Sequence, residues 1–86
     1  MKHAGPQALD GLEPLIGQLR TLPGMVEKKR GVFYRKSKAF LHFHEDPAGL
    51  FADLRAADGG DFDRYDVSQP PARQALIAIV AARLRA

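Results

Sequence analysis

The first quarter of the chain carries apolar residues at helical spacing. Between residues 7 and 22 they recur every three or four positions, at Leu9, Leu12, Leu15, Ile16, Leu19 and Leu22. This stripe predicts an amphipathic helix, which ends at Leu22-Pro23-Gly24 because proline cannot continue a helix and glycine suits the turn that follows. Pro14 allows a second interpretation, a shorter helix that begins near Leu12 with Pro14 in its first turn. Residues 1–6 precede the stripe, and we expect them to be flexible.

The middle of the chain has the composition of β-strands. Residues 26–35 contain the cluster Val32-Phe33-Tyr34 and predict one strand. Residues 39–44 predict a second strand, and Asp46-Pro47-Ala48-Gly49 fits a type I turn position by position before a third. Residues 62–67 predict a fourth strand, and their imperfect alternation indicates a bulge.

The turn at residues 46–49 fixes the pairing of the strands beside it. Counting outward, Glu45 lies opposite Leu50, Phe43 opposite Ala52, and His42 opposite Asp53. Because side chains alternate between the faces of a sheet, one face receives Leu41, Phe43, Leu50, Ala52 and Leu54. The other face receives Phe40, His42, His44, Phe51, Asp53 and Arg55. A slip of one residue would carry Asp53 into the core, so the pattern itself supports this register.

The last segment predicts a second helix. Ser68 is placed to cap it, and Pro70 and Pro71 fit its first turn. Its apolar side chains are Leu76, Ile77, Ile79, Val80 and Leu84. The predicted fold is therefore α+β, with an antiparallel sheet of three to four strands and an N-terminal and a C-terminal helix packed on one face. With 86 residues, the chain forms a single domain, residues 1–86.

Composition narrows the class of protein. Hydrophobic residues make up 45% and charged residues 27%, as in ordinary globular domains. The absence of cysteine excludes disulfides and thiolate zinc sites and favours a reducing cytoplasm. The longest apolar run, residues 75–82, is too short to span a membrane. We therefore expect a soluble, cytoplasmic protein with no membrane partner.

Part of the chain resembles a known bacterial family. Leu22-Pro23-Gly24, the run from Gly31 to Lys36, the run from Lys38 to Leu41, and Gly49-Leu50 are similar to the small MmcQ/YjbR-like domains. The resemblance covers about half of the chain, which lacks the later tryptophan-containing segment of that family. It implies an α+β fold in a largely uncharacterised bacterial group, sometimes labelled DNA-binding. It supplies no catalytic residue.

Charge is divided unevenly along the predicted sheet. Residues 20–38 hold seven cations against the single Glu27, and residues 45–66 hold seven carboxylates against Arg55 and Arg64. Cross-strand pairing of opposite charges would explain this division. The functional alternative is a basic patch for an anionic partner such as nucleic acid. Its members would be Lys28, Lys29, Arg30, Arg35, Lys36 and Lys38.

The predicted non-core face gathers polar and aromatic side chains. His42 and His44 project from it together, with Asp53 across from His42. Two imidazoles and a carboxylate can bind zinc or act as an acid–base pair, and the simpler interpretation is a polar cross-strand contact. Phe40 and Phe51 share this face, which indicates an interaction surface, a platform for a small ligand or the contact of a homodimer. The simpler alternative is a face partly covered by the N-terminal segment or a loop.

These observations favour a small bacterial binding or interaction module without catalytic activity. We expect no cofactor and no bound metal, because tight zinc sites normally use four ligands and His3 lies in the segment expected to be flexible. One alternative function is nucleic-acid binding through the basic strand patch. The other is a metal-dependent or His/Asp-based enzyme that uses His42, His44 and Asp53.

Overall fold

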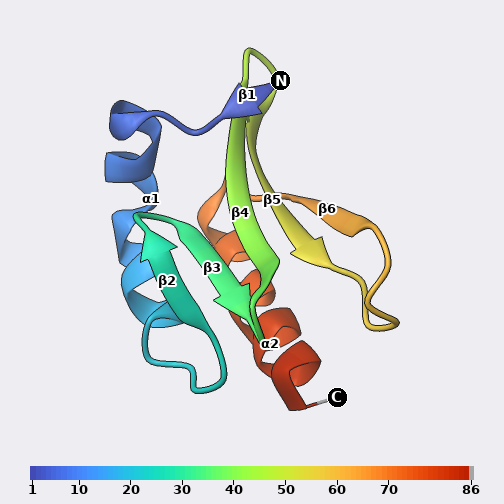
Figure 1. Ribbon diagram of the computed structural model, residues 1–86. Coiled ribbons are helices and arrows are strands. Elements are labelled where there is room, and N and C mark those ends of the chain that lie inside the picture. The colour runs from blue at the N-terminus through green and yellow to red at the C-terminus, as the bar shows by residue number, and fades with distance from the viewer. Residues whose placement is uncertain (86) are drawn as a thin grey trace.

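The computed structural model describes residues 1–85 and shows two helices and a sheet of six strands within them (Figure 1). In chain order the elements are β1 Lys2–His3, α1 Pro6–Leu19, β2 Val26–Lys29, β3 Val32–Arg35, β4 Lys38–Asp46, β5 Gly49–Arg55, β6 Phe62–Asp66 and α2 Pro70–Arg85. Every strand pairing is antiparallel. The predicted α+β class is confirmed, and the sheet is larger than the three to four strands expected.

The longest strand, β4, lies at the centre of the sheet. The strand order is β2-β3-β4-β5-β6, and β1 also pairs with β4. Two strands share one edge of β4. Strand β3 pairs with β4 as far as Leu41, and β1 pairs with β4 from His44 onward. In the interval between them, the backbone N–H of Ala4 donates to the carbonyl of Phe43 at 3.0 Å. The N-terminal segment, expected to be flexible, thus contributes a strand to the sheet.

The region from residue 26 to residue 35, predicted as one strand, is a hairpin. Strands β2 and β3 pair with each other on either side of a turn at Arg30 and Gly31. Gly31 has a φ of 76°, in the left-handed region, and a Cβ atom there would lie 2.9 Å from Leu9 Cδ2. Glycine therefore permits both the turn and the close approach of the hairpin to α1.

The register of the β4–β5 hairpin is confirmed. His42 pairs with Asp53, Phe43 with Ala52, and the series continues without interruption to the turn. Within that turn the backbone N–H of Ala48 donates to Oδ1 of Asp46 at 2.9 Å. Turn chemistry and side-chain alternation agree in this hairpin, and this agreement made its register predictable.

The bulge predicted in residues 62–67 is absent, because β5 and β6 pair without a register shift. An irregularity occurs instead between β3 and β4, where Phe33 pairs with Leu41 and Tyr34 with Ala39. The extra residue on β4 is Phe40, which is only 4% exposed and belongs to the core. Because a bulge re-aims the side chain beside it, the prediction that placed Phe40 on the histidine face is wrong.

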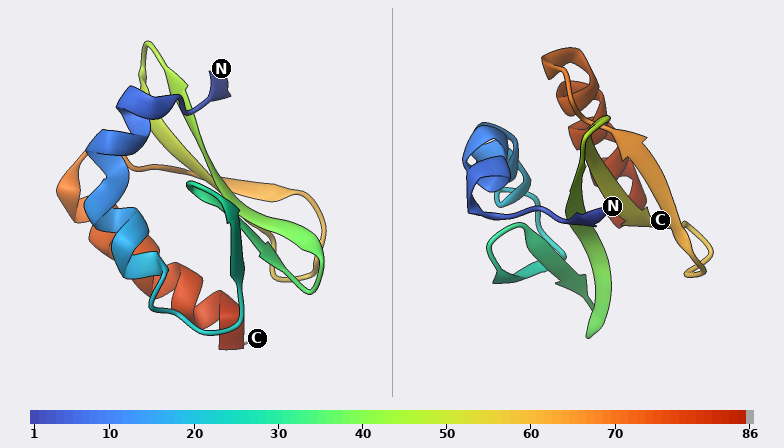
Figure 2. Two further views of the ribbon diagram at one scale, coloured as in Figure 1. Left: turned by 60° about the vertical axis from the view of Figure 1, so that its left-hand side comes forward. Right: turned by 90° about the horizontal axis from the view of Figure 1, so that it is seen from above.

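The core forms where both helices meet the sheet. In Figure 2 the two helices lie on the same side of the sheet. The fully buried side chains of the core come from α1, α2 and three strands, β3, β4 and β5, and a further one, Val67, follows β6. They include Leu12, Ile16 and Leu19 of α1, Leu76 and Val80 of α2, and Phe33, Leu41, Phe43, Ala52 and Leu54 of the sheet. No helix in the described range is both long and apolar enough to cross a membrane.

Two details of the helices differ from the sequence-based expectations. Helix α1 begins at Pro6 and contains Pro14 in its interior, so the shorter helix is wrong. Its apolar stripe, buried in the core, outweighs the one backbone hydrogen bond that an internal proline removes. Ser68 bonds to β5 and does not cap α2: its Oγ accepts from the N–H of Leu50 at 3.0 Å.

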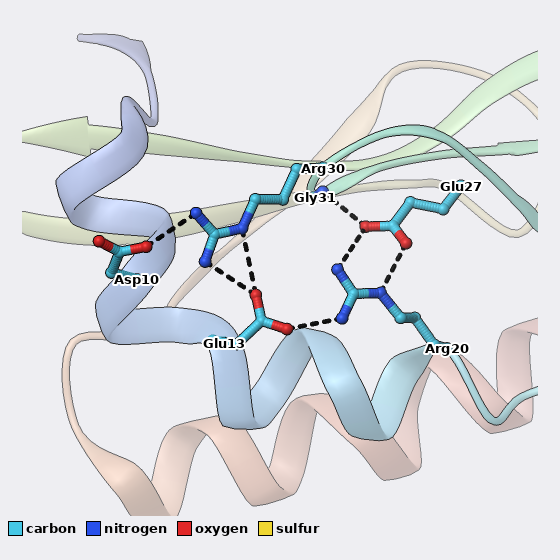
Figure 3. A network of polar contacts seen from close by, with 6 residues as sticks. All are labelled: Asp10, Glu13, Arg20, Glu27, Arg30 and Gly31. Atoms are coloured by element: carbon cyan, nitrogen blue, oxygen red, sulfur yellow. Dashed lines mark hydrogen bonds and ion pairs between the residues drawn. The ribbon is translucent and has the colours of Figure 1, made fainter.

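A network of two arginines and three carboxylates fastens α1 to the β2–β3 turn (Figure 3). Glu13 accepts from Arg20 at 2.6 Å and from Arg30 at 2.9 and 3.1 Å. Arg20 also binds Glu27, and Arg30 also binds Asp10. These cations are therefore paired with the acids of α1 and β2, and not with the acidic strands of the sheet as cross-strand pairing would require.

We expect Gly31→Ala to lower the free energy of unfolding by about 1–3 kcal/mol, from strain at positive φ together with overlap with Leu9. Gly59→Ala is the matched control, because Gly59 has a φ of 82° and open space around its Cβ position. Urea denaturation measures both variants. Equal losses would show that contact with α1 contributes nothing at Gly31.

Acid should weaken the arginine–carboxylate network. Hydrogen bonds from Arg20 and Arg30 lower the pKa of Glu13 below its ordinary value of 4.5. A carboxyl group with a depressed pKa in the folded state stabilises the protein above its unfolded pKa, and this contribution disappears as pH falls through the folded pKa. We therefore expect the Tm to fall below about pH 4.5, and Glu13→Gln to make that fall shallower. Asp61→Asn is the control: Asp61 lies outside the network, so this variant should leave the fall of Tm with pH as steep as in the unmodified protein.

Candidate functional site

Three histidines gather on the sheet face opposite the core. His42 and His44 alternate with core residues along β4, and β1 places His3 directly across from His44. The ring of His3 stacks on that of His44, with centroids 4.7 Å apart. The ring of His42 lies 4.9 Å from His44 and 5.6 Å from His3. Two chain segments that are distant in sequence thus build one imidazole cluster.

Asp53 lies beneath this cluster and is 6% exposed. Its Oδ2 is 3.2 Å from Nε2 of His44 and 3.9 Å from Nε2 of His42. Its main partner comes from β6, because Nε and Nη2 of Arg64 donate to its two oxygens at 2.7 and 2.8 Å. This bidentate, charge-assisted pair is stronger than a contact with a neutral imidazole. It is also the first cause of the lowered pKa of Asp53.

The imidazole nitrogens that face away from Asp53 have no partner within the described chain. Nδ1 of His42 and Nδ1 of His44 are buried and accept or donate no hydrogen bond among residues 1–85. Burial lowers the pKa of His42, and the neighbouring His44 lowers it further. His42 is therefore a neutral ring at neutral pH, with a free nitrogen lone pair.

Aromatic and cationic side chains border the cluster. Phe62 of β6 meets the ring of His42 edge-on, with centroids 4.8 Å apart. The guanidinium of Arg55 lies 4.4 Å from the Phe62 ring and donates to the carbonyls of Ala39 and Gly60. Phe51 pairs with His44 and is half-buried on this face, whereas Phe40 has left it for the core. Phe62 therefore takes the place that the sequence assigned to Phe40.

A cavity of about 740 Å³ opens beside the histidines, at the interval of β4 that lies between β3 and β1. Its walls come from the N-terminal segment, the start of α1, the β2–β3 hairpin, β4 and β6. The large apolar side chains that line it are Leu9, Val32, Phe43 and Phe62. Its polar side chains are those of His3, His42, Tyr34, Lys29 and Arg30. No carboxylate is among the residues that line it, within the described chain.

The six cations of the predicted basic patch fall into separate groups. Lys29 and Arg30 line the cavity just described. Arg35, Lys36 and Lys38 lie at the other end of β3, around a second hollow of about 280 Å³ that also includes Arg55 and Arg83. Lys28 lies over the ring of Tyr34, 5.7 Å from its centroid. The six cations therefore do not line one common hollow.

Sequence reasoning located His42, His44 and Asp53 but missed three of their neighbours. His3 was assigned to a flexible segment, and no motif near it signals a strand. Arg64 and Phe62 were not placed because the imperfect alternation of residues 62–67 left the register of β6 open. In the observed register Asp66 lies opposite Phe51, and counting two residues along each strand from this pair sets Arg64 across from Asp53.

Comparisons with protein-family models, with curated proteins and with solved structures each find no match to this chain. The resemblance to the MmcQ/YjbR-like domains is therefore still a prediction from its motifs.

The Asp53–Arg64 pair should show strong coupling in a double-mutant cycle. We expect Arg64→Met to lower the free energy of unfolding, because it leaves a buried carboxylate without its bidentate partner. Adding Asp53→Asn to this variant should restore part of the loss, since the unpaired charge is then removed. Urea denaturation of the two single variants and the double variant measures the coupling. Strictly additive losses would contradict a direct dependence of Asp53 on Arg64.

Proposed function

We propose that this protein is a non-catalytic binding module that takes a small molecule with an apolar body and an anionic group into the cavity beside the histidines. The observation that carries the proposal is the cavity itself. Its volume of about 740 Å³ is typical of sites for small organic ligands, which combine mostly apolar walls with a few polar groups. The proposal agrees with the binding module that the sequence favours.

The charge of the cavity supports an anionic ligand. Two cations and two histidines line it, with no lining carboxylate within residues 1–85. Arg30 is already neutralised by Asp10 and Glu13. Lys29 forms no ion pair with any described residue, so we assign the counter-charge for the ligand to Lys29. The apolar body would lie against Val32, Phe43 and Phe62.

Two observations favour binding over the alternatives. In a His/Asp enzyme the imidazole is the main partner of the carboxylate, whereas the main partner of Asp53 is Arg64, which donates to both of its oxygens. Nucleic-acid binding gains strength from several phosphate contacts on one surface, whereas the six cations lie in separate groups. In this proposal both helices pack on the core face of the sheet. The protein is bacterial and cytoplasmic, as the sequence predicts, and Phe51 is the predicted contact of a homodimer.

Two dyes that differ by one sulfonate test the proposal. We expect 1-anilinonaphthalene-8-sulfonate to bind with one saturable site, and Lys29→Glu to weaken its binding about tenfold, which corresponds to ~1.4 kcal/mol. Uncharged N-phenyl-1-naphthylamine should bind the same cavity and respond to Lys29→Glu by less than about twofold. Fluorescence titration measures both affinities.

Two further variants complete this test. Val32→Trp should block both dyes by filling the cavity, and circular dichroism checks that the variant is folded. Lys38→Glu makes the same charge change at the second hollow and should leave both affinities unchanged. Dye binding that survives Val32→Trp, or that responds equally to Lys29→Glu and Lys38→Glu, would place the ligand elsewhere and remove the proposal.

A further inference from the structure

The histidine cluster has features that a ligand cavity does not require. Three imidazoles from β1 and β4 lie with ring centroids 4.7 to 5.6 Å apart. Rings that share one zinc ion, at nitrogen–metal distances of about 2.0–2.1 Å, have centroids about 5 Å apart. The spacing of the three ring centroids therefore leaves room for a shared metal ion, once the exposed ring of His3 turns a nitrogen toward it.

The buried free nitrogens are the second feature. Most buried polar atoms in folded proteins have a hydrogen-bond partner, and each exception calls for an explanation. Nδ1 of His42 and Nδ1 of His44 are two such exceptions, on adjacent rings of the same cluster. A metal ion satisfies a nitrogen lone pair without any donor hydrogen, so it explains both atoms at once.

Asp53 faces the Nε2 atoms of both rings. It lies 3.2 and 3.9 Å from Nε2 of His44 and His42. A neutral ring that turns Nε2 toward a carboxylate carries its proton there, which leaves the lone pair on Nδ1. Carboxylates orient metal-binding histidines in this way in many proteins. Ligand atoms of His42, His44 and Asp53 lie within 4.8 Å of one another. Because Arg64 already donates to both oxygens of Asp53, we give Asp53 the role of orienting the rings and not of binding the metal.

We propose that His3, His42 and His44 bind a divalent transition metal ion of the zinc type, with Asp53 as a positioning residue. Neutral imidazoles prefer such ions, whereas magnesium and calcium prefer oxygen ligands. Three nitrogen ligands leave a fourth position open to water or to an anion. This site goes beyond the proposed ligand cavity and does not rest on it. It also replaces the ligand set of His42, His44 and Asp53 that the sequence offered.

His3 completes the site from the side of the solvent. It is exposed and belongs to a strand of two residues, whereas His42 and His44 are largely buried. Its ring stacks on that of His44. An exposed side chain can turn about its own bonds to aim a nitrogen at the shared ion without disturbing the core.

Zinc titration of the full chain, followed by the NMR resonances of the histidine rings, tests this site. We expect zinc to shift all three rings with a Kd of about 10 μM or lower, and magnesium to shift none. His42→Ala and His44→Ala should each weaken binding by at least about 100-fold, and Asp53→Asn by about tenfold, as expected of an orienting carboxylate. His3→Ala should weaken binding by about tenfold and leave the Tm unchanged, because its side chain is exposed.

Zinc is the probe because it has no redox chemistry and binds imidazole nitrogens in tetrahedral sites. Cobalt(II) gives a second readout, since its visible absorption reports a tetrahedral nitrogen site in the folded chain. No zinc-dependent shift of the rings at millimolar zinc would overturn the proposal. So would full retention of affinity in His3→Ala, or a loss in Asp53→Asn as large as in His42→Ala, which would make Asp53 a direct ligand.

Discussion

The alternation of side chains along β4 is the constraint on which the rest of the structure depends. Leu41 and Phe43 face the core, while His42 and His44 face outward, and the pairing with β5 sets Asp53 against His42. A shift of one residue would bury the histidines and expose the core. The stability of the fold and the composition of its outer face are therefore fixed by the same hydrogen-bond register. Neither can change without the other.

The cavity arises because the second edge of β4 is shared. Strand β3 stops pairing at Leu41, just after the bulge at Phe40, and β1 starts only at His44. The hairpin that forms one wall is attached to α1 through Arg30 and the close approach of Gly31 to Leu9. An interruption in strand pairing and the ion network that joins the hairpin to α1 thus shape one site together.

The parts of the fold that the sequence predicted are those where two local signals agree. The β4–β5 hairpin combines turn chemistry with clean alternation, and its predicted register is correct. The only signal of the β2–β3 turn is Gly31, which follows three charged residues. This single glycine does not outweigh the strand composition on both sides, so the sequence predicted one continuous strand. The bulge at Phe40 turns that side chain into the core, and no local pattern in the sequence signals it. β1 has two residues, too few for any periodicity, so the place of His3 was beyond sequence reasoning.

Competition for Asp53 explains why the outer face differs from the one inferred from sequence. The hairpin alone suggests that Asp53 serves the histidines, since His42 is its direct neighbour across β4. Strand β6 brings a second neighbour, Arg64, from the other side. A guanidinium is permanently charged and meets a carboxylate with two parallel bonds, whereas an imidazole can offer only one, so the arginine is the stronger partner. The carboxylate that would have neutralised a histidine cation is thereby committed to β6. Burial lowers the pKa of His42, and Nδ1 of both His42 and His44 is buried without a hydrogen-bond partner in the described chain. It is the pairing of β6, which contains none of the histidines, that decides what chemistry they can offer.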